Sequence, residues 1–453
     1  MKRLEETHVA EKMPFTREMK KTHTILAPQM LPIHFDLIAK VLRQDGYNVE
    51  VLKTDHKGIA QEGLQNVHND TCYPALLVIG QFLDALKSGK YDTDKVALLI
   101  TQTGGGCRAS NYIFLLRKAL AQNGYGHIPV ISLNFSDLEK NSGFKLTVKV
   151  LIKMVYALLY ADFLMCVHNQ CLPYETVKGS SQALVDQWLE RLLAQMETPF
   201  FVRLKQNYRA ILADFGALEL DRAQQKIKVG IVGEIYLKYA PLGNNKLEEY
   251  LVSEGAEVVN SGLLDFCMYC VYNNIYDREF YGTGGAVRHH VCKLIARYLT
   301  ARQRDMIREV KRHGVFAPPS DFAKTVEMSK QGYISHHVKM GEGWLLTAEM
   351  LELIHDGVSN IVSAQPFGCL PNHIVAKGMI RKIKDTYPLA NIVAVDYDPG
   401  ASRINQENRI KLMLANAKLT QGVSQLEYES VEDRTEPVGA GEEAGSVVAE
   451  ALA

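Results

Sequence analysis

The chain has 453 residues, of which 47% are hydrophobic and 23% charged, with 51 Lys and Arg against 51 Asp and Glu. This ordinary globular composition excludes a collagen, a mostly disordered chain and a disulfide-rich miniprotein. A net charge of zero argues against a basic nucleic-acid binder, so no nucleic-acid partner is expected. At roughly 150 residues per domain, the length predicts about three domains.

The sequence carries no signal for secretion or for a membrane. Residues 1–15 are charged and lack the apolar core of a secretory signal. No run of 18 apolar residues is present, so we expect no transmembrane helix and no membrane partner. These features predict a cytoplasmic protein. Its eight cysteines are then expected as buried thiols or metal ligands rather than as disulfides.

The first half of the chain alternates between strand-like and helix-like segments. Residues 1–21 are polar and are expected to form a loose lead-in. Apolar runs at 23–30, 48–52, 96–101 and 128–134 predict strands, and helical stretches separate them. This alternation predicts α/β domains with a parallel sheet and helices on both faces.

The second half restarts the same pattern after a helical stretch. Residues 145–225 carry apolar residues at helical spacing, and new strands are expected at 228–237 and 256–266. We therefore place a domain boundary near residue 225. The expected units are an α/β domain with a helical extension at 22–225, a second α/β domain at 226–345, a third α/β segment at 346–419 and a disordered acidic tail at 420–453.

Three cysteines share one local pattern. Cys72 follows Asn-Asp-Thr and precedes Pro74, Cys107 follows a strand and three glycines, and Cys369 follows a strand and a glycine and precedes Pro371. Because Pro is favoured in the first helical turn, this pattern predicts all three thiols at helix N-termini. The unpaired N–H groups and partial positive charge there lower a thiol pKa and favour the thiolate.

Three such thiolates point to a metal centre. Loops at the carboxyl ends of parallel strands are where open α/β sheets bind ligands. Thiolates gathered there could hold an iron–sulfur cluster, with one iron left open for substrate or water. The alternative is that each cysteine is an inert buried thiol. Spacings of 35 and 262 residues match no compact ferredoxin or zinc pattern, so the centre would be assembled between domains.

Further polar residues lie close to these cysteines. Asn69, Gln102 and Gln365 each precede one of them by a few residues, and they could either donate hydrogen bonds to a cluster or substrate or cap the following helices. Arg108 could offset the charge of a thiolate-bound cluster or remain in solvent. His336 and His337, before the turn GEGW at 341–344, could line a cleft or form a surface pair.

The remaining cysteines are weaker candidates. Cys267 and Cys270 form a C-x-x-C with apolar flanks, for which we favour packing over a redox pair. Packing is also the better interpretation for Cys166 and Cys171, near the end of a long apolar helix, and for Cys292 on another helix.

Five longer motifs resemble those of a known family. They are HNDTCYPALLVIGQF, QTGGGCRASNYIFLLRKAL, GEGWLLTAEM, QPFGCLPNHIVAKG and DYDPGASRINQENRIKLML. They resemble the 2-hydroxyacyl-CoA dehydratase superfamily. Within it, they are most similar to the branch that forms the C-terminal part of the large CoA-substrate-specific enzyme activases (acyl-CoA dehydratase activase-related proteins). The similarity runs from about residue 22 to about residue 418.

The resemblance implies Rossmann-like domains around a 4Fe-4S cluster held by Cys72, Cys107 and Cys369 at the domain junction. It also implies two partners: a separate ATP-dependent activator that delivers one low-potential electron, and a small acyl-CoA-like substrate. Related proteins hold a double-cubane 8Fe cluster with six cysteines, which this chain would approach only by recruiting others such as Cys267 and Cys270. By analogy with the paired dehydratase subunits, a dimer is expected.

Neither a phosphate-binding G-x-x-x-x-G-K-[ST] motif nor G-x-G-x-x-G is present, and GIVGE at 230–234 does not fit the second pattern. We therefore expect a partner, not this chain, to hydrolyse ATP. Two alternatives stay open. The chain could be a non-enzymatic cluster-carrying or regulatory partner of an activase system, or a metal-free or zinc-stabilised α/β binding protein.

Overall fold

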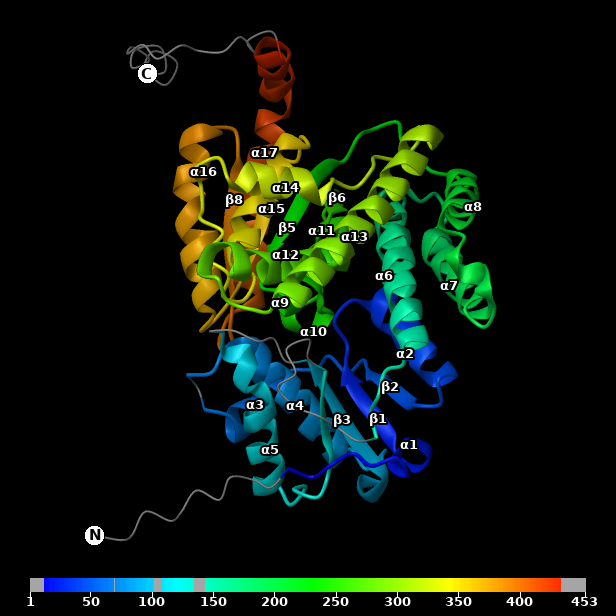
Figure 1. The fold of residues 1–453 in the computed structure, drawn as a ribbon. Coiled ribbons are helices and arrows are strands. Elements are labelled where there is room, and N and C mark those ends of the chain that lie inside the picture. The colour runs from blue at the N-terminus through cyan, green and yellow to red at the C-terminus, as the bar shows by residue number, and fades with distance from the viewer. Residues whose placement is uncertain (1–11, 69, 102–106, 134–142, 433–453) are drawn as a thin grey trace, which may run out of the picture.

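The computed structural model describes residues 12–68, 70–101, 107–133 and 143–432. Within these ranges the chain forms two four-stranded sheets, and every strand pair in them is parallel. In Figure 1 the sheet formed by the first half of the chain lies below the sheet formed by the second half. The predicted α/β class with parallel sheets is therefore confirmed.

The first sheet has the strand order β2-β1-β3-β4. Its strands are β1 (Thr24–Pro28), β2 (Asn48–Leu52), β3 (Val96–Thr101) and β4 (Val130–Leu133). All four lie where apolar runs predicted them. The register pairs Ile25 with both Val49 and Ala97, so β1 is central.

Alternate residues of these strands contact helices on opposite faces, as the two-residue period of a strand requires. Leu26 and Leu98 are fully buried in a cluster with α4 (Tyr73–Lys87) and α5 (Tyr112–Gln122). Their neighbours Ile25 and Leu99 belong instead to a cluster with α2 (Pro32–Gln44). The predicted helices on both faces are therefore present.

The second sheet has the order β6-β5-β7-β8, with β5 (Ile227–Gly233), β6 (Ala256–Val259), β7 (Asn360–Pro366) and β8 (Asn391–Tyr397). On one face, Val232 and Ile361 pack against α15 (Trp344–His355) and α16 (Ile380–Thr386). On the other, Ile231 and Val362 share a cluster with α17 (Arg403–Glu432). The segment at 346–419 thus adds β7 and β8 to the sheet begun by β5 and β6.

Both sheets reverse their strand order at the first strand. The chain passes from β1 to β2 on one side and returns to β3 on the other, and β5 is flanked in the same way by β6 and β7. Ligands of open α/β sheets bind at such switch points, outside the carboxyl ends of the strands. Cys107 follows β3, and Glu234 and Cys369 follow β5 and β7.

One hydrophobic cluster joins the two sheets. It contains Leu98 of the first sheet, Ile231 of the second, buried side chains along α4 such as Leu76, and Leu237 of α9 (Ile235–Tyr239). Because a continuous apolar core excludes water from the junction, groups placed there lie in a medium of low polarity.

Helix α4 is set tightly against α3 (Gly58–Asn66) through two glycines. A Cβ at Gly63 would lie 2.1 Å from the carbonyl oxygen of Leu76, and a Cβ at Gly80 would lie 2.1 Å from that of Ile59. Only glycine permits this approach. The contact fixes α4, and with it the position of Cys72 directly before its first residue.

A helical body lies beside the sheets (Figure 1) and contains α6 (Val148–Asn169), α7 (Ser180–Gln195), α8 (Leu204–Gly216), α12 (Leu263–Tyr281) and α13 (Ala286–His313). In the described part of the chain, one segment, Val148–Tyr174, is apolar enough to span a membrane, with a mean hydropathy of 1.9 over its best window. However, 72% of that window is buried inside the protein, as in the core helix of a globular fold.

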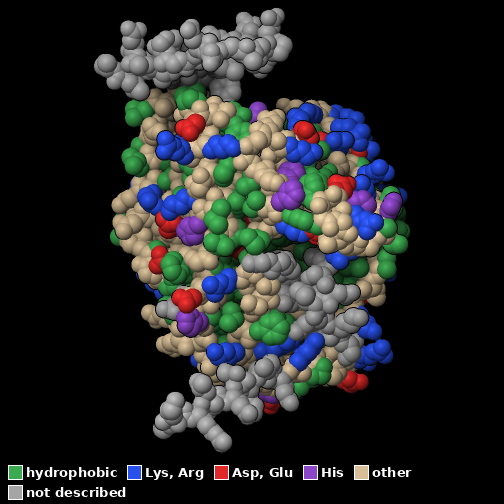
Figure 2. Space-filling view, turned by 60° about the vertical axis from the view of Figure 1, so that its left-hand side comes forward, with side chains coloured by type: hydrophobic (Ala, Val, Ile, Leu, Met, Phe, Trp, Pro, Cys, Tyr) green, Lys and Arg blue, Asp and Glu red, His purple; other side chains and the backbone are tan. Residues whose placement is uncertain are grey.

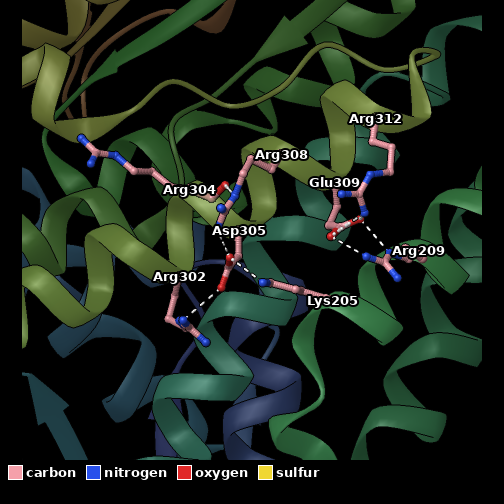
Figure 3. A network of polar contacts seen from close by, with 8 residues as sticks. All are labelled: Lys205, Arg209, Arg302, Arg304, Asp305, Arg308, Glu309 and Arg312. Carbon is pink, nitrogen blue, oxygen red and sulfur yellow. Dashed lines mark hydrogen bonds and ion pairs between the residues drawn. The ribbon is translucent and has the colours of Figure 1, made fainter.

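Ion pairs attach α13 to α8 (Figure 3). Asp305, which is almost fully buried, lies 3.3 Å from Lys205 Nζ, and the buried Glu309 accepts hydrogen bonds from Arg209. Further arginines of α13 surround both carboxylates, so each buried negative charge has several cationic partners. This pairing satisfies the charges that the helix contact buries.

The other elements are short: α1 (Met19–Thr22), α10 (Pro241–Asn244), α11 (Leu247–Ser253), α14 (Phe322–Ser329), the 3₁₀ helices η1 (Thr93–Lys95), η2 (Arg108–Asn111), η3 (Leu172–Tyr174), η4 (Pro199–Val202) and η6 (Lys377–Met379), and the π-helix η5 (Asn372–Ala376).

Some boundaries differ from the sequence expectation. Phe15 is fully buried, so the lead-in is anchored to the core. Helix α17 continues past residue 420, where we expected the tail to begin. The strand expected at 256–266 ends at Val259, and α12 begins at Leu263. The buried carboxylate of Asp162 accepts the backbone N–H groups of Leu263 (2.8 Å) and Leu264 (2.9 Å), which favours a helix there.

Candidate metal centre

Cys72 is the residue that immediately precedes α4. Its backbone is extended (φ −64°, ψ 148°), and Pro74 occupies the first turn of the helix. The side chain is buried, with 5% of its surface exposed. The predicted placement at a helix N-terminus is therefore correct.

Cys107 has the same role in front of η2, which leads directly into α5. Its backbone is again extended (φ −86°, ψ 154°), and the side chain is partly exposed. The three glycines before it and Gln102, a predicted neighbour of the centre, lie outside the described residues. Asn69, predicted to lie beside Cys72, is also outside them.

Cys369 follows β7 through a tight turn. Its N–H donates to the carbonyl of Pro366 (3.2 Å), Gly368 has φ +74°, and a helical segment with Pro371 follows. The side chain is buried, with 6% of its surface exposed. All three cysteines thus begin helical segments, as their shared sequence pattern predicts.

The structure brings the three loops together. The N–H of Tyr73 donates to the carbonyl of Phe367 (3.0 Å), which joins the Cys72 loop to the Cys369 loop. A Cβ at Gly341 would lie 3.7 Å from Cys107 Sγ and 3.1 Å from Pro371 Cγ. Gly341 therefore lies between the second and third cysteine motifs.

Two carboxyl groups that were not predicted lie in the same junction. Glu234 directly follows β5 and precedes α9, and its Oε2 accepts the N–H of Leu237 (2.9 Å). Glu342, from the GEGW turn, accepts the N–H of Ile235 through Oε1 (3.0 Å). Burial, together with the neighbouring Glu342, raises the pKa of Glu234 to about 8. The sequence could have indicated Glu234, because it is a charged residue directly after a buried strand. Cys107 and Cys369 likewise follow strands.

The thiol pKa values contradict one expectation. Burial raises the pKa of Cys72 to about 12, and it raises the pKa values of Cys107 and Cys369 as well. Glu234 raises all three further, and Glu342 raises those of Cys107 and Cys369. Removal from water therefore outweighs the helix N-terminus, which we expected to lower them. A bound metal would supply the positive charge that thiolates need here.

Each sulfur has a hydrogen-bonding neighbour. The Tyr112 hydroxyl lies 2.8 Å from Cys72 Sγ, and the Asn372 amide donates to Cys369 Sγ (3.2 Å). Backbone N–H groups of Arg108 and Ala109 interact with the sulfur of Cys107. Neither Tyr112 nor Asn372 was predicted. Asn372 lies in the same motif as the cysteine that it contacts. Tyr112 lies in the Cys107 motif but contacts Cys72.

Two other predicted neighbours have different roles. The amide of Gln365 is fully buried and donates to Ser363 Oγ on the same strand (2.7 Å), not to a cysteine sulfur. The side chain of Arg108 is exposed, and it has no ion-pair partner among the described residues. His336 is buried against Trp344 (ring centroids 4.5 Å apart), whereas His337 is exposed.

The additional cysteines fall into two groups. Cys267 and Cys270 lie one turn apart on α12, and burial raises the pKa of both thiols. Glu342 raises the pKa of Cys270 further, whereas Asp162 and Asp265 raise that of Cys267. Cys171 is buried in the helical core, Cys166 packs near Ala317, and Cys292 lies on α13.

Among the described residues, no group of three or more His, Cys, Asp or Glu side chains could hold a single metal ion. A cluster differs from an ion in this respect, because each thiolate binds a different iron of a larger body. Two buried thiols and one partly exposed thiol from three loops, each with its own hydrogen-bonding neighbour, fit such a group. No family model matches the chain, and no curated protein is significantly similar to it.

Proposed function

We propose that this chain is a cytoplasmic iron–sulfur protein in which Cys72, Cys107 and Cys369 hold a 4Fe-4S cluster between two α/β bodies. The observation that carries the proposal is the convergence of three helix-initiating cysteines: Cys107 and Cys369 follow β3 and β7 at the carboxyl ends of the two sheets, and the Cys72 loop is hydrogen-bonded to the Cys369 loop. Three chain ligands would leave one iron open to a small molecule. The family resemblance makes that molecule acyl-CoA-like and the reaction a reduction or dehydration.

The cluster would supply one-electron chemistry, and the protein would control access and charge. The hydrophobic cluster that joins the sheets includes Cys72 and would keep water from its sulfur. Because burial and the neighbouring Glu342 raise the pKa of Glu234, the protonated form of this carboxyl group is favoured beside the thiols. A neutral acid is the form suited to lie near a negatively charged cluster and to give a proton to a leaving hydroxyl.

A protein partner is part of this proposal. Exposed hydrophobic side chains lie close to the candidate ligands: Phe114, Met340, Phe367, Leu370 and Ile374. Apolar groups are also exposed near the middle of the face shown in Figure 2. Such patches mark protein interaction sites. We propose that an ATP-dependent activator docks at this junction and delivers the electron, since the sequence has no phosphate-binding loop of its own.

The test is the iron and acid-labile sulfide content of the anaerobically purified protein. We expect about four irons per chain and their loss in Cys107→Ser. The matched control is Cys292→Ser, because Cys292 lies on α13, outside the three motifs. About eight irons would favour a double cubane that recruits Cys270. A folded protein without iron would refute the cluster and favour a metal-free binding protein.

A further inference from the structure

Two buried side chains contact the candidate ligand sulfurs and have no other hydrogen-bond partner in the described parts of the chain. The first is Tyr112, whose hydroxyl lies 2.8 Å from Cys72 Sγ, with both residues buried. Either atom could donate while the thiol keeps its proton. A metal-bound thiolate has no proton, so the phenol, whose ordinary pKa is about 10, would then be the donor.

Tyr112 connects two of the cysteine motifs. It is the first residue of α5, the helix that follows Cys107 and η2, yet its hydroxyl contacts the sulfur in front of α4. The hydrogen bond therefore sets the position of Cys72 relative to α5, the helix that follows Cys107. A buried tyrosine needs a partner for its hydroxyl, and here that partner is a ligand sulfur.

The second side chain is Asn372, which is fully buried in the first turn after Cys369. Its Nδ2 donates to Cys369 Sγ (3.2 Å), and its Oδ1 has no partner within the described residues. The side chain does not cap the π-helix η5 that it begins. Neither helix capping nor a backbone contact therefore explains this buried amide, and π-helical turns are frequent at functional sites.

We propose that Tyr112 and Asn372 are positioning residues that hold the sulfurs of Cys72 and Cys369 as metal-ligating thiolates and raise the reduction potential of the centre. This inference rests on the proposed function. A donor hydrogen placed against a ligand sulfur stabilises negative charge there. Reduction adds negative charge, so these hydrogen bonds favour the reduced form.

The third sulfur provides an internal contrast. Cys107 interacts with backbone N–H groups of Arg108 and Ala109, which no side-chain substitution removes. Within the part of the chain that the structure describes, side-chain donors therefore act on the sulfurs of Cys72 and Cys369 and not on that of Cys107. Because the two donors act on different sulfurs, their effects should combine nearly additively in the double variant.

The test compares Tyr112→Phe and Asn372→Leu with the wild-type protein. The matched control is Tyr236→Phe, because Tyr236 lies in the same hydrophobic cluster as Tyr112 and its hydroxyl has no partner within the described residues. Iron content, the thermal midpoint and the midpoint potential from an anaerobic redox titration are measured for each protein. We expect the reduction equilibrium to move three- to tenfold toward the oxidised form in each donor variant, at most about 59 mV for one electron.

The outcomes separate this inference from the proposed function. Wild-type protein without iron would refute both. Donor variants that keep their iron and share the potential of the Tyr236→Phe control would refute the positioning role alone. A donor variant that folds but binds less iron would support it, because the hydrogen bond would then be needed to hold the ligand. Tyr112→Phe and Asn372→Leu test the positioning role separately. If only one of them folds, its iron content and potential decide whether the inference holds.

Discussion

The N–H of Tyr73 and the carbonyl oxygen of Phe367 form a 3.0 Å hydrogen bond between the two α/β bodies. Tyr73 directly follows Cys72, and Phe367 lies two residues before Cys369. Gly368, between Phe367 and Cys369, adopts φ +74°. A Cβ added at Gly368 would lie 3.2 Å from Cys72 Cα. The relative placement of two candidate ligands thus depends on one backbone contact and one glycine.

Gly368→Ala is expected to lower both stability and iron content. The left-handed conformation costs an alanine about 1–2 kcal/mol, and the added methyl group would push the Cys72 loop away. The matched control is Gly124→Ala, which has φ +81° but no atom within 4 Å of the added Cβ. The control should lose stability and keep its iron. Equal iron in the two variants would show that the contact does not position the ligands.

Gly80→Ala is expected to destabilise the protein by about 3 kcal/mol, the upper part of the range for overpacking. The added Cβ would lie 2.1 Å from the carbonyl of Ile59, and a backbone carbonyl in a helix cannot yield without moving α3. Denaturant unfolding measures the change. The control is Gly126→Ala, whose Cβ would make only an ordinary 3.6 Å contact. A difference of less than about 1 kcal/mol between them would contradict the close packing of α3 and α4.

The sequence predicts the strands well, because they are short runs of buried apolar residues between turns. The strands expected at 48–52 and 96–101 match β2 and β3 residue for residue. The placement of all three motif cysteines at helix N-termini is also correct, since glycine, proline and polar residues act locally on the chain. The expectation that each would lie in a loop leaving a strand is wrong for Cys72, because α3 precedes it. The strand expected at 256–266 is too long, because Asp162, about 100 residues away in the sequence, caps the helix that begins at Leu263.

The chemistry of the site was harder to predict, since it depends on contacts between distant segments. Helix N-termini suggested acidic thiols, but burial beside Glu234 and Glu342 raises their pKa values instead. The hydrogen bond between Tyr112 and Cys72 joins residues 40 positions apart, and no local pattern indicates it. The local pattern around each cysteine indicates the candidate ligands, whereas their electrostatic surroundings follow only from the fold.

Lys238 and Glu349 form a buried ion pair (Nζ–Oε1 2.8 Å) beside Ser261. Lys238→Met is expected to destabilise the protein by about 3–5 kcal/mol, because it leaves a buried carboxylate without its partner. The double variant Lys238→Met/Glu349→Leu should be less destabilised than the single one. Denaturant unfolding of the wild type, the single variants Lys238→Met and Glu349→Leu, and the double variant gives the coupling. Additive losses would mean that the pair does not interact.

Glu352 gives the fold a predictable dependence on pH. Burial raises its pKa from 4.5 to about 7, and the nearby Glu349 adds to the effect, although the hydroxyl of Thr325 donates to the carboxylate and opposes it. Between pH 4.5 and about pH 7, Glu352 holds a proton in the folded protein that it has lost in the unfolded chain. The contribution of this group to stability is therefore complete below pH 4.5 and is lost as the pH rises through about 7.

Glu352→Gln should remove that dependence. The amide has the shape of the protonated acid and can still accept the hydrogen bond from Thr325, but it does not titrate. We expect unfolding free energies close to wild type at pH 4.5 and higher at pH 8, by at most about 3 kcal/mol. The exposed Glu327→Gln serves as the control and should follow the wild-type pH profile. A Glu352→Gln profile parallel to wild type would mean that this carboxyl group ionises normally in the fold, and that the helix carrying it is more hydrated than its burial indicates.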